Sequence, residues 1–275
     1  MPSIESPAWA EHPDLVAFYR QHRNHPDDLY PSERRFLPWL ARHATSVLDA
    51  GCASWGFSDI WRHYQSGIVY TGVDLSEALM QAARSLHPHD TFLRGDVTQG
   101  MTLPDRCATV VQALGWLHWE PRYREALAEL WRVTDRYLFF DVRLHDRPAR
   151  LLHGVQHLTF DGPWDGQTST PYLILPWERL ARELLALRPR TILGYGYWGD
   201  PASTVTGVRG RVCFATFVLE RGTGAQSRAT PLVCIDLPLA WPAALSHCVV
   251  HRPGSQLDDL LALDDSLHSQ REGAG

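Results

Sequence analysis

Short apolar runs alternate, through the first half of the chain, with segments whose apolar residues recur every three or four positions. The runs predict strands at 46–50, 67–73, 91–95, 108–114 and 136–143. The periodic segments predict helices at 56–65, 77–86 and 121–134. Regular alternation of strands and helices is typical of a parallel sheet that is covered by helices on both faces.

Two segments fall outside this alternation. Residues 13–43 have helical periodicity, and Ser32 is placed to cap a second helix that Pro38 would kink or interrupt. Residues 144–172 are rich in His, Asp, Gly, Pro and Thr, which predicts a long irregular connection. A connection of that length inside a compact domain is usually functional or mobile.

The last third of the chain returns to regular patterns. A helix is predicted at 177–187, and apolar runs at 190–198 and 211–219 predict an antiparallel hairpin that completes the sheet. Residues 232–237 predict an additional edge strand, and 256–268 a terminal helix.

The composition narrows the class of protein. The chain has 275 residues, of which 44% are hydrophobic and 21% charged, so it can form a packed core. The formal net charge is −5 and the 26 Lys and Arg form no dense run, which argues against a nucleic-acid partner. The five cysteines form no CxxC pair, so no zinc site is expected. The absence of a signal-peptide pattern or a long apolar stretch favours a cytoplasmic protein without a membrane partner.

The first predicted strand leads into a glycine-rich turn. The pattern Gly51-x-Ala53-x-x-Gly56 fits a loose dinucleotide fingerprint, with Asp74 at the right distance to hold a ribose hydroxyl. Asp49 favours another ligand, because its carboxylate would repel a pyrophosphate. An amino-acid head group fits better, with its ammonium on Asp49 and its carboxylate on backbone N–H groups near the turn.

Five segments in order carry a resemblance to a known family. Each segment contains the end of a predicted strand or helix, followed by a turn or an acidic residue. Together the segments resemble the class I S-adenosylmethionine-dependent methyltransferases of type 11/12. The segments are 47–53 (VLDAGCA), 70–76 (YTGVDLS), 92–97 (FLRGDV), 108–119 (ATVVQALGWLHW) and 130–141 (LWRVTDRYLFFD).

The resemblance implies roles for individual positions. The turn after the first strand would hold the methionine portion, the second strand end the ribose, the third the adenine, and the fourth the methionine side of the sulfonium. The residues implied are Asp49, Gly51, Cys52 and Ala53; Asp74 and Leu75; Asp96 and Val97; and Gln112 and Ala113. All would lie at carboxyl ends of parallel strands.

Candidates for acceptor chemistry follow the fourth strand. His118 is either a candidate general base or a histidine that packs beside a helix start. Asp141 and His157 are the next candidates for the general base. Trp119, Tyr172, Tyr195 and Tyr197 are candidates for an acceptor pocket or for ordinary hairpin packing. No metal site is expected, because Asp141 and its neighbours lack a third ligand.

These observations predict an α/β protein, a Rossmann-like seven-stranded mostly parallel sheet with a C-terminal antiparallel hairpin and helices on both faces. The expected divisions are an N-terminal helical lid at 1–44, a methyltransferase domain at 45–220 with an insertion at about 144–172, and a C-terminal extension at 221–275. The expected reaction is in-line methyl transfer to a small-molecule acceptor, such as a sugar intermediate or a secondary metabolite. The oligomeric state is not set by the sequence.

Two alternatives belong to other classes. A non-catalytic scaffold or binding protein with this fold is one, because Trp55 occupies a position where the family often has glycine. The other is an NAD-dependent oxidoreductase, which Asp49 and the closing hairpin disfavour.

Overall fold

The computed structural model describes residues 8–147, 151–222 and 230–251. Five strands carry the parallel part of its sheet, and each lies close to its predicted range. They are β1 (Ser46–Ala50), β2 (Val69–Asp74), β3 (Thr91–Arg94), β4 (Ala108–Ala113) and β5 (Thr134–His145). Their spatial order is β5-β4-β1-β2-β3, and all four of these pairings are parallel.

The sheet continues beyond β5 with the predicted hairpin. Strand β10 (Val212–Glu220) inserts between β5 and β8 (Thr191–Gly199) and is antiparallel to both. The mostly parallel sheet with a C-terminal antiparallel hairpin is therefore confirmed. The sheet is wider than the predicted seven strands, because β11 (Leu232–Asp236) pairs with β8 and β12 (Val249–His251) pairs with β11. Residues 232–237 were thus predicted correctly as a strand, but β12 forms the edge.

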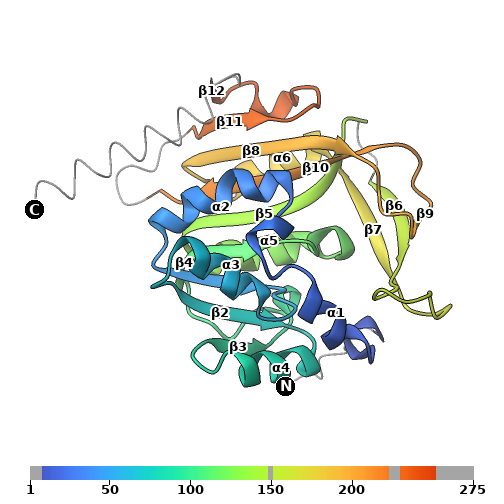
Figure 1. The fold of residues 1–275 in the computed structure, drawn as a ribbon. Coiled ribbons are helices and arrows are strands. Elements are labelled where there is room, and N and C mark those ends of the chain that lie inside the picture. Colours follow the sequence, from blue (N-terminus) through green and yellow to red (C-terminus); the bar gives the residue numbers. More distant parts are fainter. Residues whose placement is uncertain (1–7, 148–150, 223–229, 252–275) are drawn as a thin grey trace, which may run out of the picture.

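Helices cover both faces of the sheet, as predicted. Alternate residues of each strand point to opposite faces, so Val47 and Val110 pack with one set of helices and Leu48 and Val111 with the other. The first set is α2 (Pro31–His43), α3 (Gly56–Tyr64) and α4 (Glu77–Leu86). The second is α5 (Tyr123–Val133) and α6 (Trp177–Ala186). Helices α2 and α3 lie on the face turned toward the viewer in Figure 1.

The N-terminal segment differs from its prediction in detail. Helix α1 (Leu15–Gln21) is short, and α2 begins at Pro31, with Tyr30 rather than Ser32 as its N-cap. Glu33 accepts a hydrogen bond from the Tyr30 N–H at 2.7 Å, and a proline fits at the first helical position. Pro38 does not interrupt α2, because burial of the surrounding apolar face outweighs the one hydrogen bond that a proline removes.

The predicted irregular connection at 144–172 contains regular structure. Strand β5 extends to His145, and β6 (Leu152–His157) pairs antiparallel with β7 (Ser169–Pro176). The short β9 (Val205–Thr206) adds to β6, and Figure 1 shows this group beside the carboxyl end of β5. Strand β6 has no apolar alternation because much of it is exposed, so its sequence resembles a loop.

Several predictions are left untested. The terminal helix expected at 256–268 lies outside the described residues. The boundaries of the lid, the domain and the extension remain predictions, as does the cytoplasmic location. Within the described ranges, no helix combines the length and apolarity that crossing a membrane requires.

Candidate functional site

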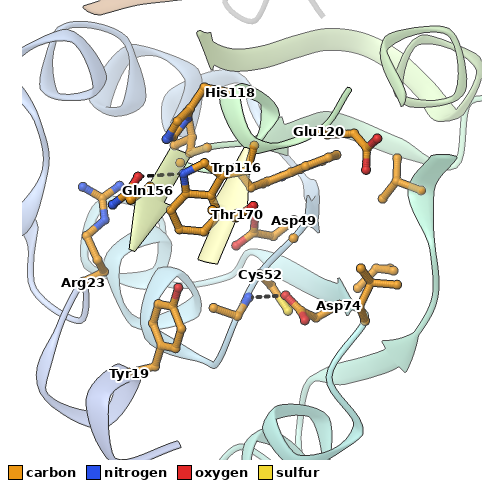
Figure 2. Close-up of a pocket in the computed structure, with 18 of the residues that line it drawn as sticks. Tyr19, Arg23, Asp49, Cys52, Asp74, Trp116, His118, Glu120, Gln156 and Thr170 are labelled. Atoms are coloured by element: carbon orange, nitrogen blue, oxygen red, sulfur yellow. Dashed lines mark hydrogen bonds between the residues drawn. The ribbon is translucent and has the colours of Figure 1, made fainter. Parts of the chain in front are cut away.

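A cavity of about 1020 Å³ lies at the carboxyl ends of β1, β2 and β4. Open α/β sheets bind their ligands at this edge. The turns after these strands form one wall, and residues of the N-terminal segment and of β6 and β7 form the opposite one. In Figure 2, Asp74 and Glu120 lie to one side of Asp49, and Arg23 and Gln156 lie to the other. The cavity thus has two ends that are lined by different elements.

Asp49 is a buried carboxylate near the centre of the cavity wall. The Tyr70 hydroxyl donates a hydrogen bond to its Oδ2 at 2.6 Å, and Gln112 lies opposite it in the β1–β4 register. Burial raises the pKa of Asp49 to about 7, although the hydrogen bond from Tyr70 opposes that shift. A positively charged ligand group would favour the ionised form of this carboxyl.

The turn after β1 is held in one shape. Gly51 has a φ of +76°, and a Cβ atom there would lie 2.4 Å from the Trp116 ring. The N–H groups of Gly51 and Cys52 both donate to the Val73 carbonyl, and that of Ala53 donates to Asp74 Oδ2 at 2.9 Å. These three amides are therefore not available to a ligand carboxylate, contrary to what the sequence pattern indicated for this turn.

Asp74 ends β2 and faces the same cavity. Its two carboxylate oxygens accept backbone hydrogen bonds from Ala53 and Ser76, each at 2.9 Å. Burial raises its pKa to about 6, and the backbone hydrogen bonds oppose the shift. Each oxygen retains a second acceptor position, and Leu75 lines the cavity beside it.

Asp96 and Val97 also line the cavity. The Asp96 carboxylate already accepts hydrogen bonds from the Thr98 N–H and hydroxyl and from the Gln99 amide, at 2.6 to 2.8 Å. Arg122 lies 3.5 Å from its other face. The carboxylate is thus held rigidly at this end of the cavity.

Two predicted residues do not line the cavity. The Gln112 side chain lies in the protein interior and accepts a hydrogen bond from Trp61 Nε1 at 2.9 Å, and Ala113 is part of the core. Leu114 and Gly115 line the cavity in their place. The reason is that β4 ends at Ala113, so the following turn supplies the wall.

His118, Trp119 and Tyr172 line the other end of the cavity. The His118 ring lies 5.2 Å from both the Trp119 and the Tyr172 rings, and its Nδ1 has no hydrogen-bonding partner among the described residues. Burial and the charge of Arg143 hold the pKa of His118 well below its usual value. The Trp119 indole donates to Gln156 Oε1 at 2.9 Å.

Four predicted acceptor or catalytic residues lie elsewhere. Asp141 is buried behind the wall, where it accepts hydrogen bonds from the Gly115 N–H at 2.5 Å and from Arg143 at 2.6 Å. His157, Tyr195 and Tyr197 are engaged in ring contacts with Trp164, Arg35 and Phe214, respectively. These contacts arise from strand pairing and long-range packing, which the sequence pattern does not specify.

Neighbouring contacts fix the orientation of Trp55. Residues 8–147, 151–222 and 230–251 contain no group of three His, Cys, Asp or Glu that could hold a metal ion. The Trp55 side chain is buried in the core and stacks on His87, with ring centroids 6.0 Å apart. It is not among the residues that line the cavity, so it leaves the cavity open.

Several residues that line the cavity were not predicted from the sequence. Tyr19 and Arg23 reach the cavity from the N-terminal segment, Trp116 from the turn after β4, and Gln156 from β6. Trp116 was signalled by its place in the turn that follows β4, two positions before His118. The others come from distant segments, and no local pattern marks them.

Comparison with known proteins agrees with this geometry. Residues 48–137 match a family described as a methyltransferase domain. The malonyl-(acyl-carrier protein) O-methyltransferase of Pectobacterium atrosepticum is 36% identical over 104 residues, which cover 38% of this chain and 40% of that protein. The corresponding protein of Serratia marcescens is 35% identical over 88 residues, covering 32% and 33%. The chain thus matches less than half the length of either relative.

A solved structure shows the same fold. The N-terminal domain of EvdMO1, crystallised in the presence of SAH and D-fucose, has a TM-score of 0.50 and 14% sequence identity, and the match covers 77% of this chain and 84% of that one. The family match agrees with the methyltransferase domain that the sequence predicts. Residues 48–137 of this chain are therefore similar to a methyltransferase domain.

Proposed function

We propose that this protein transfers the methyl group of S-adenosylmethionine to an oxygen of a small-molecule acceptor. The observation that carries the proposal is the pair of buried carboxylates, Asp49 and Asp74, at the ends of adjacent parallel strands on one cavity wall. Asp49 would hold the cofactor's ammonium group. Asp74, with its two remaining acceptor positions, would hold the ribose hydroxyls.

The donor set in the cavity fits the cofactor. Burial raises the pKa of Asp49, and the charge of Arg23 offsets that shift only in part, so a cationic ligand group would favour the ionised carboxylate. Gly51 lets the Trp116 ring pack directly against the turn, where a Cβ atom would lie 2.4 Å from the ring. Asp96 and Val97, which line the cavity beyond Asp74, would contact the adenine.

The bound cofactor supplies a methyl group on a sulfonium, whose leaving group is a neutral thioether. The residues of this chain then contribute orientation and the exclusion of water. Alignment of two reactants in one cavity contributes up to about 7–11 kcal/mol to lowering a barrier of this kind. Trp119, Gln156 and Tyr172, at the end of the cavity away from Asp74, would orient the acceptor.

The acceptor named for the relatives is not part of this proposal. Their names specify a malonyl group on an acyl-carrier protein. Gln156, Thr170 and Tyr172 form one wall of the cavity and come after residues 48–137 in the sequence. This wall therefore lies outside the segment that matches the family. A small-molecule acceptor is therefore proposed from the cavity itself.

Calorimetry with S-adenosylmethionine, S-adenosylhomocysteine and NAD tests the proposal. We expect the first two to bind and NAD not to bind. Asp74→Asn should weaken binding of both by about tenfold or more, because a charged hydrogen-bond acceptor contributes about 1.5–3 kcal/mol. Asp105→Asn, at an exposed carboxyl, is the matched control. Binding of NAD alone would support the oxidoreductase, and binding of none of the three would support the scaffold protein.

A further inference from the structure

The amino-acid end of the proposed cofactor carries a carboxylate as well as an ammonium group, and the turn after β1 does not supply the carboxylate with a partner. The N–H groups of Gly51, Cys52 and Ala53 are all bonded within the protein. Asp49 and Asp74, on the same wall, would repel a further negative charge. A carboxylate that leaves water without gaining hydrogen-bond donors is costly, so its donors must come from another element that lines the cavity.

Arg23, in the N-terminal segment, has donors of the right kind. It lines the cavity, and its guanidinium donates from Nη2 to Glu33 at 2.6 Å and from Nη1 to the Asp28 carbonyl at 3.0 Å. A guanidinium has five N–H groups, so these two hydrogen bonds leave donors over. The Arg23 side chain is 21% exposed, and the described polar atoms that are buried without a partner include none of its nitrogens. The remaining N–H groups of Arg23 are therefore accessible and not sealed in the interior.

Tyr19 provides a second donor beside Arg23. In Figure 2 its hydroxyl points into the cavity, between Arg23 and Asp74. The hydroxyl donates no hydrogen bond among the described residues, and it is not one of the polar atoms that are buried without a partner. Burial and the charge of Asp74 raise the pKa of Tyr19, so the group stays a neutral O–H donor.

The backbone and the contacts around Arg23 hold its guanidinium in one position. Its φ is +63°, which is unfavourable for a residue with a Cβ and persists only where the neighbours hold it. The buried Glu33 pairs with the guanidinium, and the ring centroids of Tyr30 and Phe57 lie 4.5 and 5.0 Å from its Cζ. Gly56 lets the Arg23 carbonyl pack on the start of α3, because a Cβ there would lie 2.3 Å from that oxygen. Strained residues that are held in this way cluster at sites that bind ligands.

Opposite charges thus face the cavity from two of its walls. The charge of Arg23 opposes the rise in the Asp49 pKa, so the two groups are within electrostatic reach of each other. Figure 2 shows Arg23 and Asp74 on opposite sides of Asp49. An α-amino acid carries its ammonium and its carboxylate on one carbon, so it can bridge a carboxylate on one wall and a guanidinium on the other. A guanidinium also matches a carboxylate in shape, because it can donate two parallel hydrogen bonds.

We propose that Arg23 and the Tyr19 hydroxyl hold the carboxylate of the cofactor, while Asp49 holds its ammonium group. The proposal rests on the proposed function. Arg23 and Tyr19 precede residues 48–137, the segment that matches the family. The N-terminal segment of this chain would therefore complete the site, in place of the turn amides that the sequence pattern indicated for this role.

Two ligands that differ only in the carboxylate test the proposal. S-adenosylhomocysteine and its decarboxylated analogue share the amine, the thioether, the ribose and the adenine. Calorimetry with the wild-type protein should find S-adenosylhomocysteine bound about tenfold or more tightly, because the analogue gives the donors of Arg23 and Tyr19 no charged acceptor. Equal affinity for the two ligands, or tighter binding of the analogue, overturns the proposal. If neither ligand binds, the proposed function itself fails.

Two variants locate the contact with the carboxylate. Arg23→Lys keeps a cation beside Glu33 but loses the guanidinium fork, and Tyr19→Phe removes only the hydroxyl. Each should weaken S-adenosylhomocysteine by about fivefold or more and leave the affinity for the analogue within about twofold. Arg20→Lys, at an exposed position on α1, and Tyr64→Phe, on α3 outside the cavity, are the matched controls.

The comparison between the two ligands separates a binding role from a structural one. An equal loss of affinity for both ligands would assign Arg23 and Tyr19 to the packing of the N-terminal segment and overturn the proposal. Wild-type affinity of either folded variant for S-adenosylhomocysteine would overturn it as well. If Arg23→Lys does not fold, Tyr19→Phe decides the question by itself, because it deletes a single oxygen.

Discussion

Replacing Asp49 by Asn should stabilise the protein, and by more as the pH rises. Asp49 ionises at about 3.8 in an unfolded chain and at about 7 in the fold, because burial disfavours its charge. Between these values the folded protein binds more protons at this site than the unfolded chain does. Stability therefore falls as the pH rises through this window, and asparagine, which does not ionise, removes that fall.

The magnitude follows from the width of the window. Each pH unit within it changes the free energy of unfolding by about 1.4 kcal/mol. From about pH 5 to about pH 7, the advantage of Asp49→Asn over the wild type should grow by about 2–3 kcal/mol. The effects of the buried Asn amide and of its hydrogen bond from Tyr70 do not depend on pH, so they cancel in this difference.

Urea unfolding of both proteins at a series of pH values measures the effect. Asp14→Asn, at a carboxyl whose side chain is 69% exposed, provides a control whose difference from the wild type should stay constant. The same Asp49→Asn protein should lose affinity for S-adenosylmethionine at every pH. A constant difference in unfolding free energy between wild type and Asp49→Asn would refute the account of a buried carboxyl that ionises near neutrality.

Three further predictions concern the same wall of the cavity. Affinity for S-adenosylmethionine should fall by up to about tenfold for each pH unit below the Asp49 pKa of about 7, because only the carboxylate holds the ammonium group. Calorimetry that finds equal affinity from neutral to mildly acidic pH would contradict this prediction. Tyr70→Phe should move the midpoint of that pH dependence upward by about one unit, since the hydroxyl stabilises the ionised form through a charged hydrogen bond, and an unmoved midpoint would rule out that role. Gly51→Ala should destabilise the protein by about 1–3 kcal/mol, because the new Cβ would clash with Trp116 and the residue has a positive φ. Gly67→Ala, at a position with open space around it, should change the unfolding free energy by less than about 1 kcal/mol.

The sequence by itself determined the parallel half of the sheet and the carboxylates at its edge. The strands and helices of residues 46–145 can be predicted from the sequence pattern. Buried side chains recur every second residue in a strand and every three to four residues in a helix. Asp49 and Asp74 end such strands, and parallel strands bring their carboxyl ends to one edge. The wall of the cavity that carries Asp49 and Asp74 could therefore be predicted without a structure.

Only the tertiary structure decided the opposite end of the cavity, which His118 and Tyr172 line. Whether Trp55 enters the cavity depends on its stacking with His87, more than thirty positions later. The state of His118 depends on Arg143 and Tyr172, which arrive on β5 and β7. These environments arise from packing between segments that are distant in the chain, and burial and neighbouring charge, which fix a pKa or a hydrogen bond, exist only after that packing has formed.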